Sequence, residues 1–325
     1  MKLIIDGFGK TIHKQDNHII IKDNDKIIYD DLAEKINSLT IMGKGHITFD
    51  AITLLTKNNV NIISINYYTN QTNYIINSME NQTKITTLKK QVYYSDNSKS
   101  IQTAQEIIKS KIKNQIYTLK TLNKQKNNIQ IDTIIKQINT YLEKVDDIND
   151  KEELLGLEGI TSKNYWKAIK NFIPEEYEFE NRSKKPAKDL INAMLNYGYS
   201  ILASQITNEI LKSGLNPDIG ILHKDLDKRH SLTYDIIEEF RQQIVDKSIL
   251  SLIHNKQIKI EDYQNQEITL EKRKIIISKI IEKLETEITY NNEKITYHQI
   301  IEKQINKLKN TIIHDEKYTG FYNKW

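Results

Sequence analysis

The feature that most constrains the fold is a change in the spacing of apolar residues near residue 81. Before it, short runs rich in isoleucine alternate with Asp, Asn and Gly, as in strands joined by turns. Within this part, only residues 50–57 show the apolar spacing of a helix. We therefore expect residues 1–81 to form a small, mostly antiparallel β domain. Because its sheet has a second face to bury, we also expect this domain to supply a dimer contact.

After this point the chain has the pattern of a helical protein. Apolar residues recur at helical spacing from residue 101 to residue 142, and residues 123–128 look like a connection between two helices. The three prolines lie in or beside expected loops, where they cannot break a helix. The fold class predicted is α+β with two domains, in which residues 82–325 form the larger, all-α catalytic domain. Further helices are expected over residues 190–211, 234–245, 273–284 and 297–312.

The composition narrows the classes of function. The chain has no cysteine, which excludes disulfides, zinc–thiolate sites and thiol catalysis and fits a reducing compartment. Its first apolar run is interrupted at Asp6, so it does not resemble a secretory signal. No stretch approaches the ~20 apolar residues of a membrane helix. We expect a cytoplasmic protein that does not bind a membrane.

Positive charge is concentrated in one stretch. The net charge is only +4, but residues 82–126 hold ten lysines against Asp96 and Glu106, with tyrosines between them. A phosphate backbone would be attracted to such a stretch. A solvated helix surface in a lysine-rich chain explains the same pattern, so both interpretations stay open.

A group of acids and one imidazole suggests metal chemistry. Asp235 and Glu238 are three residues apart on an expected helix and therefore share a face, whereas Glu239 points about 100° away. His223 precedes this helix, and residues 224–233 form a loop long enough to bring the imidazole back over it. By spacing alone, however, such an acid pair is more often a solvated helix face, and a lone histidine is more often not a ligand.

Glu158 is a further candidate from a distant segment. It is flanked by Gly156 and Gly159, and glycines beside an acid allow a bulky polymer to approach the backbone. Carboxylates and an imidazole that converge on one point suit Mn²⁺ or Mg²⁺. Hard divalent ions of this kind promote reactions of phosphodiester bonds. The residues therefore suggest a metal-dependent enzyme that acts on nucleic acid.

Several motifs in order resemble a known family. They are EGITSKNYW at residues 158–166, NRSKKP at 181–186 followed by NAMLNYGY at 192–199, NPDIGILH at 216–223, and YDIIEEFR at 234–241. The segments IDGFGK and IMGKGHITFDAI near the N-terminus add to the likeness. Together they resemble the CRISPR-associated integrase of spacer acquisition, the first of the Cas protein families. Departures from the family pattern at residues 161–163, 187 and 242 touch none of the expected ligands.

The resemblance implies an activity and a set of site residues. The implied activity is that of a metal-dependent DNA endonuclease and integrase, which joins the 3′-hydroxyl ends of short foreign DNA to a CRISPR array by transesterification. Asp235 would be a nearby acid that shapes the catalytic site, or an alternate ligand. Arg182, Lys184, Lys185 and Arg241 would contact DNA phosphates. The implied ligands of a Mg²⁺ or Mn²⁺ ion are Glu158, His223 and Glu238.

The resemblance also implies binding partners, and alternative functions remain to be considered. The implied partners are double-stranded and branched DNA, a second copy of the chain, and a small ferredoxin-fold adaptation protein. A transposon integrase of the casposase type is a related alternative; such proteins usually carry extra DNA-binding sequence after the last helix, and this chain stops at Trp325. A DNA-binding scaffold with a vestigial metal site belongs to a different class. An all-α interaction module would leave the glycine-flanked Glu158 unexplained.

Overall fold

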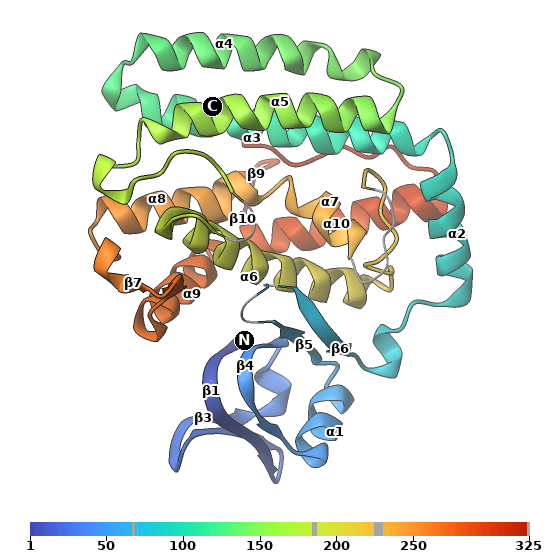
Figure 1. The fold of residues 1–325 in the computed structure, drawn as a ribbon. Helices are drawn as coiled ribbons and strands as arrows, with labels where there is room; N and C mark the ends of the chain where they lie inside the picture. The colour runs from blue at the N-terminus through green and yellow to red at the C-terminus, as the bar shows by residue number, and fades with distance from the viewer. Residues whose placement is uncertain (67–68, 70, 184–186, 224–229, 324–325) are drawn as a thin grey trace.

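The computed structural model describes residues 1–66, 69, 71–183, 187–223 and 230–323. A sheet-rich part lies at the bottom of Figure 1 and a helical part lies above it. The strands are β1 (Lys2–Gln15), β2 (His18–Asp23), β3 (Lys26–Leu32), β4 (Ser38–Ile47), β5 (Asn61–Ile65), β6 (Thr72–Ile76), β7 (Tyr263–Gln264), β8 (Glu267–Ile268), β9 (Glu287–Tyr290) and β10 (Glu293–Thr296). The α-helices are α1 (Phe49–Lys57), α2 (Ile85–Asp96), α3 (Ser100–Lys126), α4 (Ile129–Glu143), α5 (Lys151–Lys170), α6 (Leu190–Ser213), α7 (Ser231–Ile237), α8 (Lys247–His254), α9 (Leu270–Leu284) and α10 (Tyr297–His314).

The first six strands form one mixed sheet in the order β3-β2-β1-β4-β5-β6. Three strand pairs are antiparallel, as expected. The β1–β4 and β4–β5 pairs are parallel, so the sheet is mixed and mostly, but not wholly, antiparallel. Parallel neighbours need a crossover connection, which α1 supplies between β4 and β5 and the β2–β3 hairpin supplies between β1 and β4. The helix expected over residues 50–57 is confirmed as α1.

Glycines allow the two long strands to approach each other. Gly7 on β1 lies opposite Gly43 on β4. A Cβ atom on Gly43 would lie 1.7 Å from the Gly7 carbonyl oxygen, so no other residue fits there without moving the strand. Both glycines belong to the N-terminal segments that carry the family likeness.

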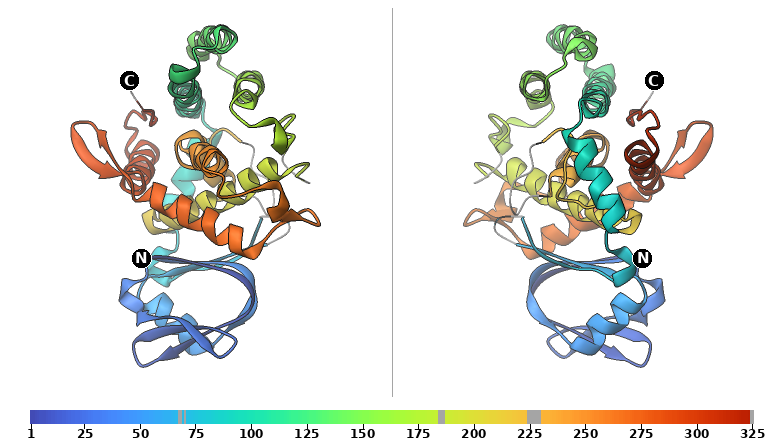
Figure 2. Two further views of the ribbon diagram at one scale, coloured as in Figure 1. Left: turned by 90° about the vertical axis from the view of Figure 1, so that its left-hand side faces the viewer. Right: turned by 90° about the vertical axis from the view of Figure 1, so that its right-hand side faces the viewer.

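The two faces of the sheet are buried within the same chain. One face packs with α1 around Leu39 and Leu55, and the other joins the helical core through Met42 and Ile63. Helix α6 contacts β4 and β5, and α9 contacts β1. The side views in Figure 2 show these helices above the sheet. Helices of the same chain therefore pack on both faces, so the sheet does not need a second chain to cover one of them; a dimer contact from this domain stays a prediction.

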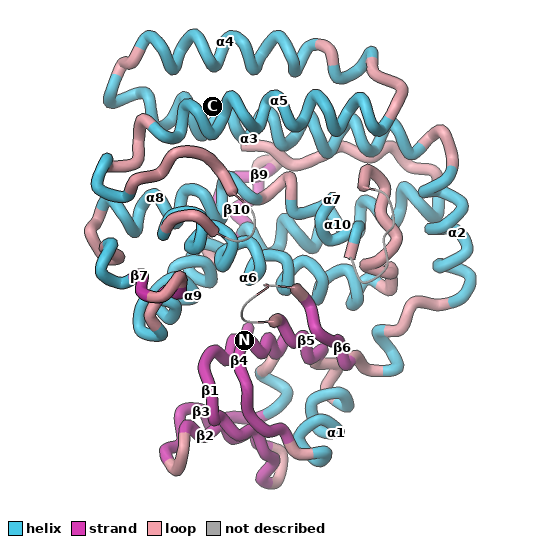
Figure 3. Tube along the Cα trace, in the orientation of Figure 1, coloured by secondary structure: helices cyan, strands magenta, loops and turns pink. Residues whose placement is uncertain are grey.

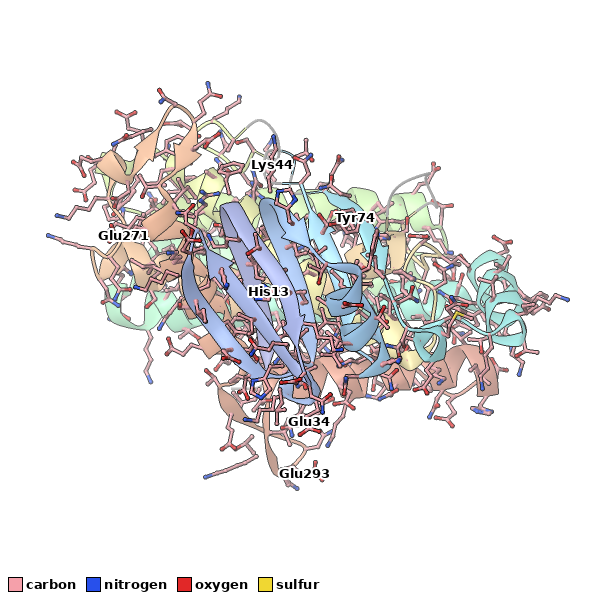
Figure 4. All side chains as sticks on the ribbon, turned by 90° about the horizontal axis from the view of Figure 1, so that it is seen from below. His13, Glu34, Lys44, Tyr74, Glu271 and Glu293 are labelled. Atoms are coloured by element: carbon pink, nitrogen blue, oxygen red, sulfur yellow. The ribbon has the colours of Figure 1, made fainter. Side chains whose placement is uncertain are left out.

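Polar contacts connect the sheet to the helices. Asp6 on β1 is buried, and its carboxylate accepts a hydrogen bond of 2.9 Å from the Tyr197 hydroxyl on α6 and pairs with the Arg273 guanidinium on α9 at 3.3 Å. Thr40 donates to Ser204 at 3.2 Å. Seen from below, the sheet faces the viewer with His13 upon it and Glu271 of α9 toward one margin (Figure 4). Specific polar bonds, as well as apolar packing, therefore position the two parts.

The helical part surrounds α6. This helix is buried on nearly all sides, begins at the N-cap Asp189 and ends at Gly214, whose φ of +79° suits a glycine C-cap. Helices α3, α4 and α5 pack together at the top of Figures 1 and 3, and α7, α8 and α10 lie between this group and α6. The expected helices over residues 190–211, 273–284 and 297–312 are confirmed as α6, α9 and α10.

Two features of the helical part were not expected. The helix expected over residues 234–245 is broken, because α7 ends at Ile237 and a π-helical turn, Gln242–Asp246, leads into α8. The part expected to be all helical also contains the hairpins β7–β8 and β9–β10. The turn of the second hairpin is Asn291–Asn292, and both residues have positive φ, as two-residue hairpin turns require. The Asn–Asn pair in the sequence is a short-range signal for this turn.

Candidate active site

Helix α5 presents Glu158 to the centre of the helical part. The helix begins at Asp150, whose side chain accepts from the backbone N–H groups of Glu152 and Glu153 at 2.9 Å. One turn beyond Glu158, the Ser162 hydroxyl donates to its carboxylate at 2.8 Å. The Glu158 side chain is 22% exposed, so part of it is in contact with solvent.

Glu238 follows directly after α7 and lies deeper. Its side chain is 7% exposed and pairs with the Lys111 ammonium at 2.7 Å and with the Arg241 guanidinium at 3.0 Å. Burial opposes ionisation of Glu238, but these two cations outweigh it and lower its pKa to about 2. Glu238 is therefore a buried carboxylate that stays charged.

Lys111 connects the two glutamates and was missed from the sequence. Its ammonium, on α3, contacts Glu158 as well as Glu238, and its side chain is only 7% exposed. Burial opposes its charged form, yet the two carboxylates raise its pKa. A signal was present, because Lys111 lies on the apolar stripe of its helix, between Ile108 and Ile112. A lysine at such a position is buried only if it is paired.

Asp235 orients His223. Asp235 is fully buried, and one of its oxygens accepts from the His223 Nδ1 at 2.6 Å and from its backbone N–H at 3.1 Å. The other oxygen accepts from the backbone N–H groups of Ile221 and Leu222 at 2.5 and 3.0 Å. An ionised carboxylate can only accept, so Nδ1 carries a proton, and Nε2 is the ring nitrogen that a neutral imidazole would offer to a ligand. This arrangement supports a role for Asp235 in shaping the site, since both oxygens already have donors.

Gly220 leaves room for the Asp235 carboxylate to contact the backbone of residues 221–223. A Cβ atom at this position would lie 2.8 Å from the His223 carbonyl oxygen and 3.1 Å from the Asp235 carboxylate. Of the loop expected over residues 224–233, residues 224–229 lie outside the described part of the chain.

The fold brings Glu158, His223, Asp235 and Glu238 into one region of the protein, but their side chains are not arranged as the ligands of a bound metal ion. Glu158 and Glu238 share one cation, and His223 is near enough to Glu238 to contribute to its lowered pKa. Within residues that the structure describes, no three His, Asp or Glu side chains already stand in a metal-binding arrangement. The ligand assignment therefore stays a prediction.

Two of the residues predicted to contact DNA, Arg182 and Arg241, interact with other side chains of the protein. Arg241 stacks on the Tyr199 ring at 4.6 Å, and Arg182 lies over the same ring at 5.3 Å. Arg182 also donates to Asn192 and Asn196 on α6, at 2.9 and 2.6 Å. Lys184 and Lys185 lie outside the described residues. Contact of these four residues with DNA stays a prediction.

The lysine-rich stretch forms α2 and α3, and several of its lysines already have partners. Lys109 pairs with Asp146 at 2.7 Å, Lys113 lies 4.1 Å over the Tyr322 ring, and Lys126 donates to a backbone carbonyl. The stretch is therefore not a uniform row of solvated charges, and its contact with DNA stays a prediction.

A C-terminal segment not anticipated from the sequence lies behind the site. Glu239, which points away from Glu238, accepts from the Tyr318 hydroxyl at 2.6 Å, from the Phe321 backbone N–H at 2.7 Å and from Gln304 at 3.0 Å. These bonds attach the segment after α10 to the backbone that carries Glu238. They also explain which of the two adjacent glutamates faces the site.

Gly159 permits a test of how closely a polymer approaches α5. A Cβ atom at Gly159 would have no neighbour within 4 Å, so packing does not require glycine there. We expect Gly159→Ala to raise the free energy of unfolding by about 0.5–1 kcal/mol, because alanine favours the helix. We expect the same variant to bind branched DNA more weakly, measured by fluorescence anisotropy. Since the variant is more stable, unfolding cannot explain weaker binding; unchanged affinity would contradict close approach.

Asp246 makes stability depend on pH. Its carboxylate accepts from the hydroxyls of Tyr165 and Tyr199, and burial raises its pKa from 3.8 to about 6. Between these values the folded protein holds a proton that the unfolded chain releases. The free energy of unfolding therefore falls as pH rises through this window, by on the order of 3 kcal/mol. In urea unfolding, we expect Asp246→Asn to gain stability relative to wild type from pH 4 to pH 7; a constant difference would contradict this.

Tyr165 and Trp166 follow Glu158 at helical spacing, and by their residue types alone we expect core packing rather than stacking on bases. Tyr165 is fully buried, and Trp166 packs between it and Phe179. The expectation of core packing is confirmed.

Across the described residues, no helix combines the length and apolar character needed to cross a membrane.

The family model and the related sequences that match this chain all point to the same family. The family model described as CRISPR associated protein Cas1 matches residues 3–310. CRISPR-associated protein Cas1 3 of Methanobrevibacter ruminantium is 41% identical over 336 residues, and the match covers 100% of both chains. CRISPR-associated endonuclease Cas1 1 of Archaeoglobus fulgidus is 33% identical and is also covered completely.

Solved structures share the fold. A casposase bound to an integration product superposes with a TM-score of 0.87 at 24% identity, covering 98% of this chain and 92% of that chain. A Cas1 protein from Thermotoga maritima gives a TM-score of 0.84 at 20% identity, with 99% and 100% covered. A chain of a Cas6-RT-Cas1–Cas2 complex gives 0.87 at 23% identity, covering 100% of this chain and 36% of that one.

Proposed function

Because this chain belongs to the Cas1 family of CRISPR-associated proteins, we propose that it is a metal-dependent DNA endonuclease and integrase of spacer acquisition. In the proposed reaction, the 3′-hydroxyl of a short foreign DNA attacks a phosphodiester of the CRISPR array. One phosphodiester bond forms as another breaks, so no external energy source is needed. Water in place of the hydroxyl would give cleavage.

The observation that carries this proposal is the meeting of Glu158 and Glu238 on one buried cation, beside a histidine with a fixed tautomer. The two carboxylates already pair with an ammonium group, and an imidazole lies nearby. Carboxylate oxygens and an imidazole nitrogen are ligand atoms that suit Mg²⁺ or Mn²⁺. Glu158, Glu238 and His223 would hold the ion. When bound, it would supply Lewis-acid stabilisation of charge on the phosphoryl oxygens.

The surrounding residues have separate proposed tasks. Asp235 holds the Nδ1 proton of His223, which would leave Nε2 of the neutral imidazole as the nitrogen that binds a metal ion. Arg241 keeps Glu238 ionised and oriented, and stacking on Tyr199 limits its movement. The Glu158 side chain is partly accessible to solvent, as contact with a DNA strand requires.

The proposed partners are double-stranded and branched DNA, a second copy of the chain, and a small ferredoxin-fold adaptation protein. Support for DNA comes from the casposase neighbour bound to an integration product, and support for a Cas partner comes from the Cas1–Cas2 neighbour. Exposed Phe8 and Phe49 on the β domain would suit contact with a second protein chain.

A strand-transfer assay tests the proposed function. The chain, with and without the adaptation partner, is incubated with a protospacer-like duplex and a plasmid that contains a CRISPR repeat. We expect joined product in Mn²⁺ and none after chelation. Equal joining to a plasmid without the repeat would favour the casposase-type alternative. DNA binding without joining or cleavage in either metal would favour the scaffold alternative and contradict the proposal.

A further inference from the structure

Lys111 occupies the place between the two glutamates that a bound cation would share. Its ammonium contacts one oxygen of Glu158 and lies 2.7 Å from one oxygen of Glu238. These carboxylates come from different parts of the chain, α5 and the end of α7. Without a cation between them, two charged carboxylates in a largely buried site would repel each other.

We infer that Lys111 is an internal counter-cation, which holds Glu158 and Glu238 together in the metal-free protein and gives up this position when a divalent ion binds. The inference rests on the proposed function, because it requires a metal site at these residues. It assigns to the chain a residue that sets metal affinity and prepares the site before metal arrives.

The exchange follows from geometry and charge. An ammonium and a divalent ion cannot both approach the same carboxylate oxygens, because they would repel each other at a few ångströms in a poorly solvated site. Lys111 has a long, unbranched side chain, so its ammonium can swing away without movement of α3. The Glu158 side chain that it contacts is 22% exposed, so the ion pair is not closed off from solvent.

Arg241 does not compete in this way. It pairs with the other carboxylate oxygen of Glu238, and its guanidinium is held against the Tyr199 ring at 4.6 Å. Of these two cations, Lys111 alone bridges both glutamates in the described structure. Lys111 is therefore the cation that metal binding displaces.

Calorimetry with Mn²⁺ and the full chain, without DNA, tests the inference. We expect Lys111→Met, which keeps the side-chain length and removes the charge, to bind Mn²⁺ at least about tenfold more tightly than wild type. Its Tm in chelator should be lower, and Mn²⁺ should raise that Tm more than it raises the wild-type Tm. Unchanged or weaker Mn²⁺ binding by a folded Lys111→Met would overturn the inference.

Lys109 provides the matched control. It is on the same helix and also pairs with two acids, Glu106 and Asp146, but these lie outside the site. Lys109→Met should lose stability without any change in Mn²⁺ affinity. Equal tightening in both variants would assign the effect to net charge and would also overturn the inference.

A second measurement uses the wild-type protein and does not depend on the folding of a variant. Lysines are labelled with an amine-reactive ester, with and without Mn²⁺, and quantified by peptide mass spectrometry. Labelling of Lys111 should increase severalfold in Mn²⁺, while labelling of Lys109 stays constant. Decreased or unchanged labelling of Lys111 would overturn the displacement.

Glutamine variants separate this inference from the proposed function. If Glu158→Gln and Glu238→Gln abolish Mn²⁺ binding but Lys111→Met does not tighten it, the metal site stands and the inference fails. If the glutamine variants bind Mn²⁺ as wild type does, the metal site itself is wrong, and the inference fails with it.

Discussion

Replacing Glu238 by glutamine is expected to lower Mn²⁺-dependent strand transfer about a thousandfold or more, equivalent to about 4 kcal/mol of transition-state stabilisation. Glutamine keeps the shape of the side chain but loses the charge that pairs with Lys111 and Arg241. A neutral amide oxygen is also a weaker ligand for a hard divalent ion than a carboxylate is. The measurement is the single-turnover rate of joining, with folding verified by circular dichroism.

The adjacent Glu239 offers a control that differs by one position. It is also buried, but its oxygens accept hydrogen bonds from the C-terminal segment and from Gln304 rather than facing the site. We expect Glu239→Gln to lose some stability and to keep strand transfer near the wild-type rate. A similar loss of activity in both variants would contradict the assignment of Glu238 as the ligand.

Replacing Asp235 by asparagine is expected to reduce both stability and metal binding. The carboxylate accepts four N–H groups from residues 221–223, and asparagine would turn an N–H₂ group toward donors. A buried donor left without an acceptor costs about 1–3 kcal/mol, measurable by urea unfolding. The tautomer of His223 would also no longer be fixed, and we expect about 10–100-fold weaker Mn²⁺ binding by calorimetry.

Asp218 provides the comparison for this variant. Its carboxylate pairs with the His230 ring at 2.5 Å, as a second Asp–His pair near the same loop, but it is 60% exposed. We expect Asp218→Asn to change the free energy of unfolding by less than about 0.5 kcal/mol and to leave Mn²⁺ affinity intact. If Asp235→Asn were as mild as Asp218→Asn, the orienting role of Asp235 would be wrong.

Much of the fold was predictable because the relevant signals are local. The change of apolar spacing near residue 81 separates a sheet-rich part from a helical part, and the helices expected near Leu190, Arg273 and Tyr297 exist. The parallel pairing of β1 with β4 was not predictable from spacing. The same alternation of side chains serves parallel and antiparallel neighbours, and only the path of the connections decides between them.

The sequence named most of the residues that meet in the candidate site, but it did not predict the contacts that these residues make. Helical geometry separated Glu238 from Glu239 correctly, since the two point to different surroundings. Lys111 was missed because it was counted with the other lysines of its stretch as possible DNA-binding charge. Its burial depends on α5 and α7, which lie far from α3 in the sequence.

The sequence by itself determined the family and the order of strand-rich and helix-rich parts, and it supplied the few acids and the imidazole that we propose as metal ligands. Periodicity and motif order are properties of neighbouring residues, so they can be read without coordinates. Only the tertiary structure decided which cation lies between Glu158 and Glu238, and that Asp235 orients His223. Those contacts join residues distant in the chain, and their strength depends on burial, which exists only after the chain has folded.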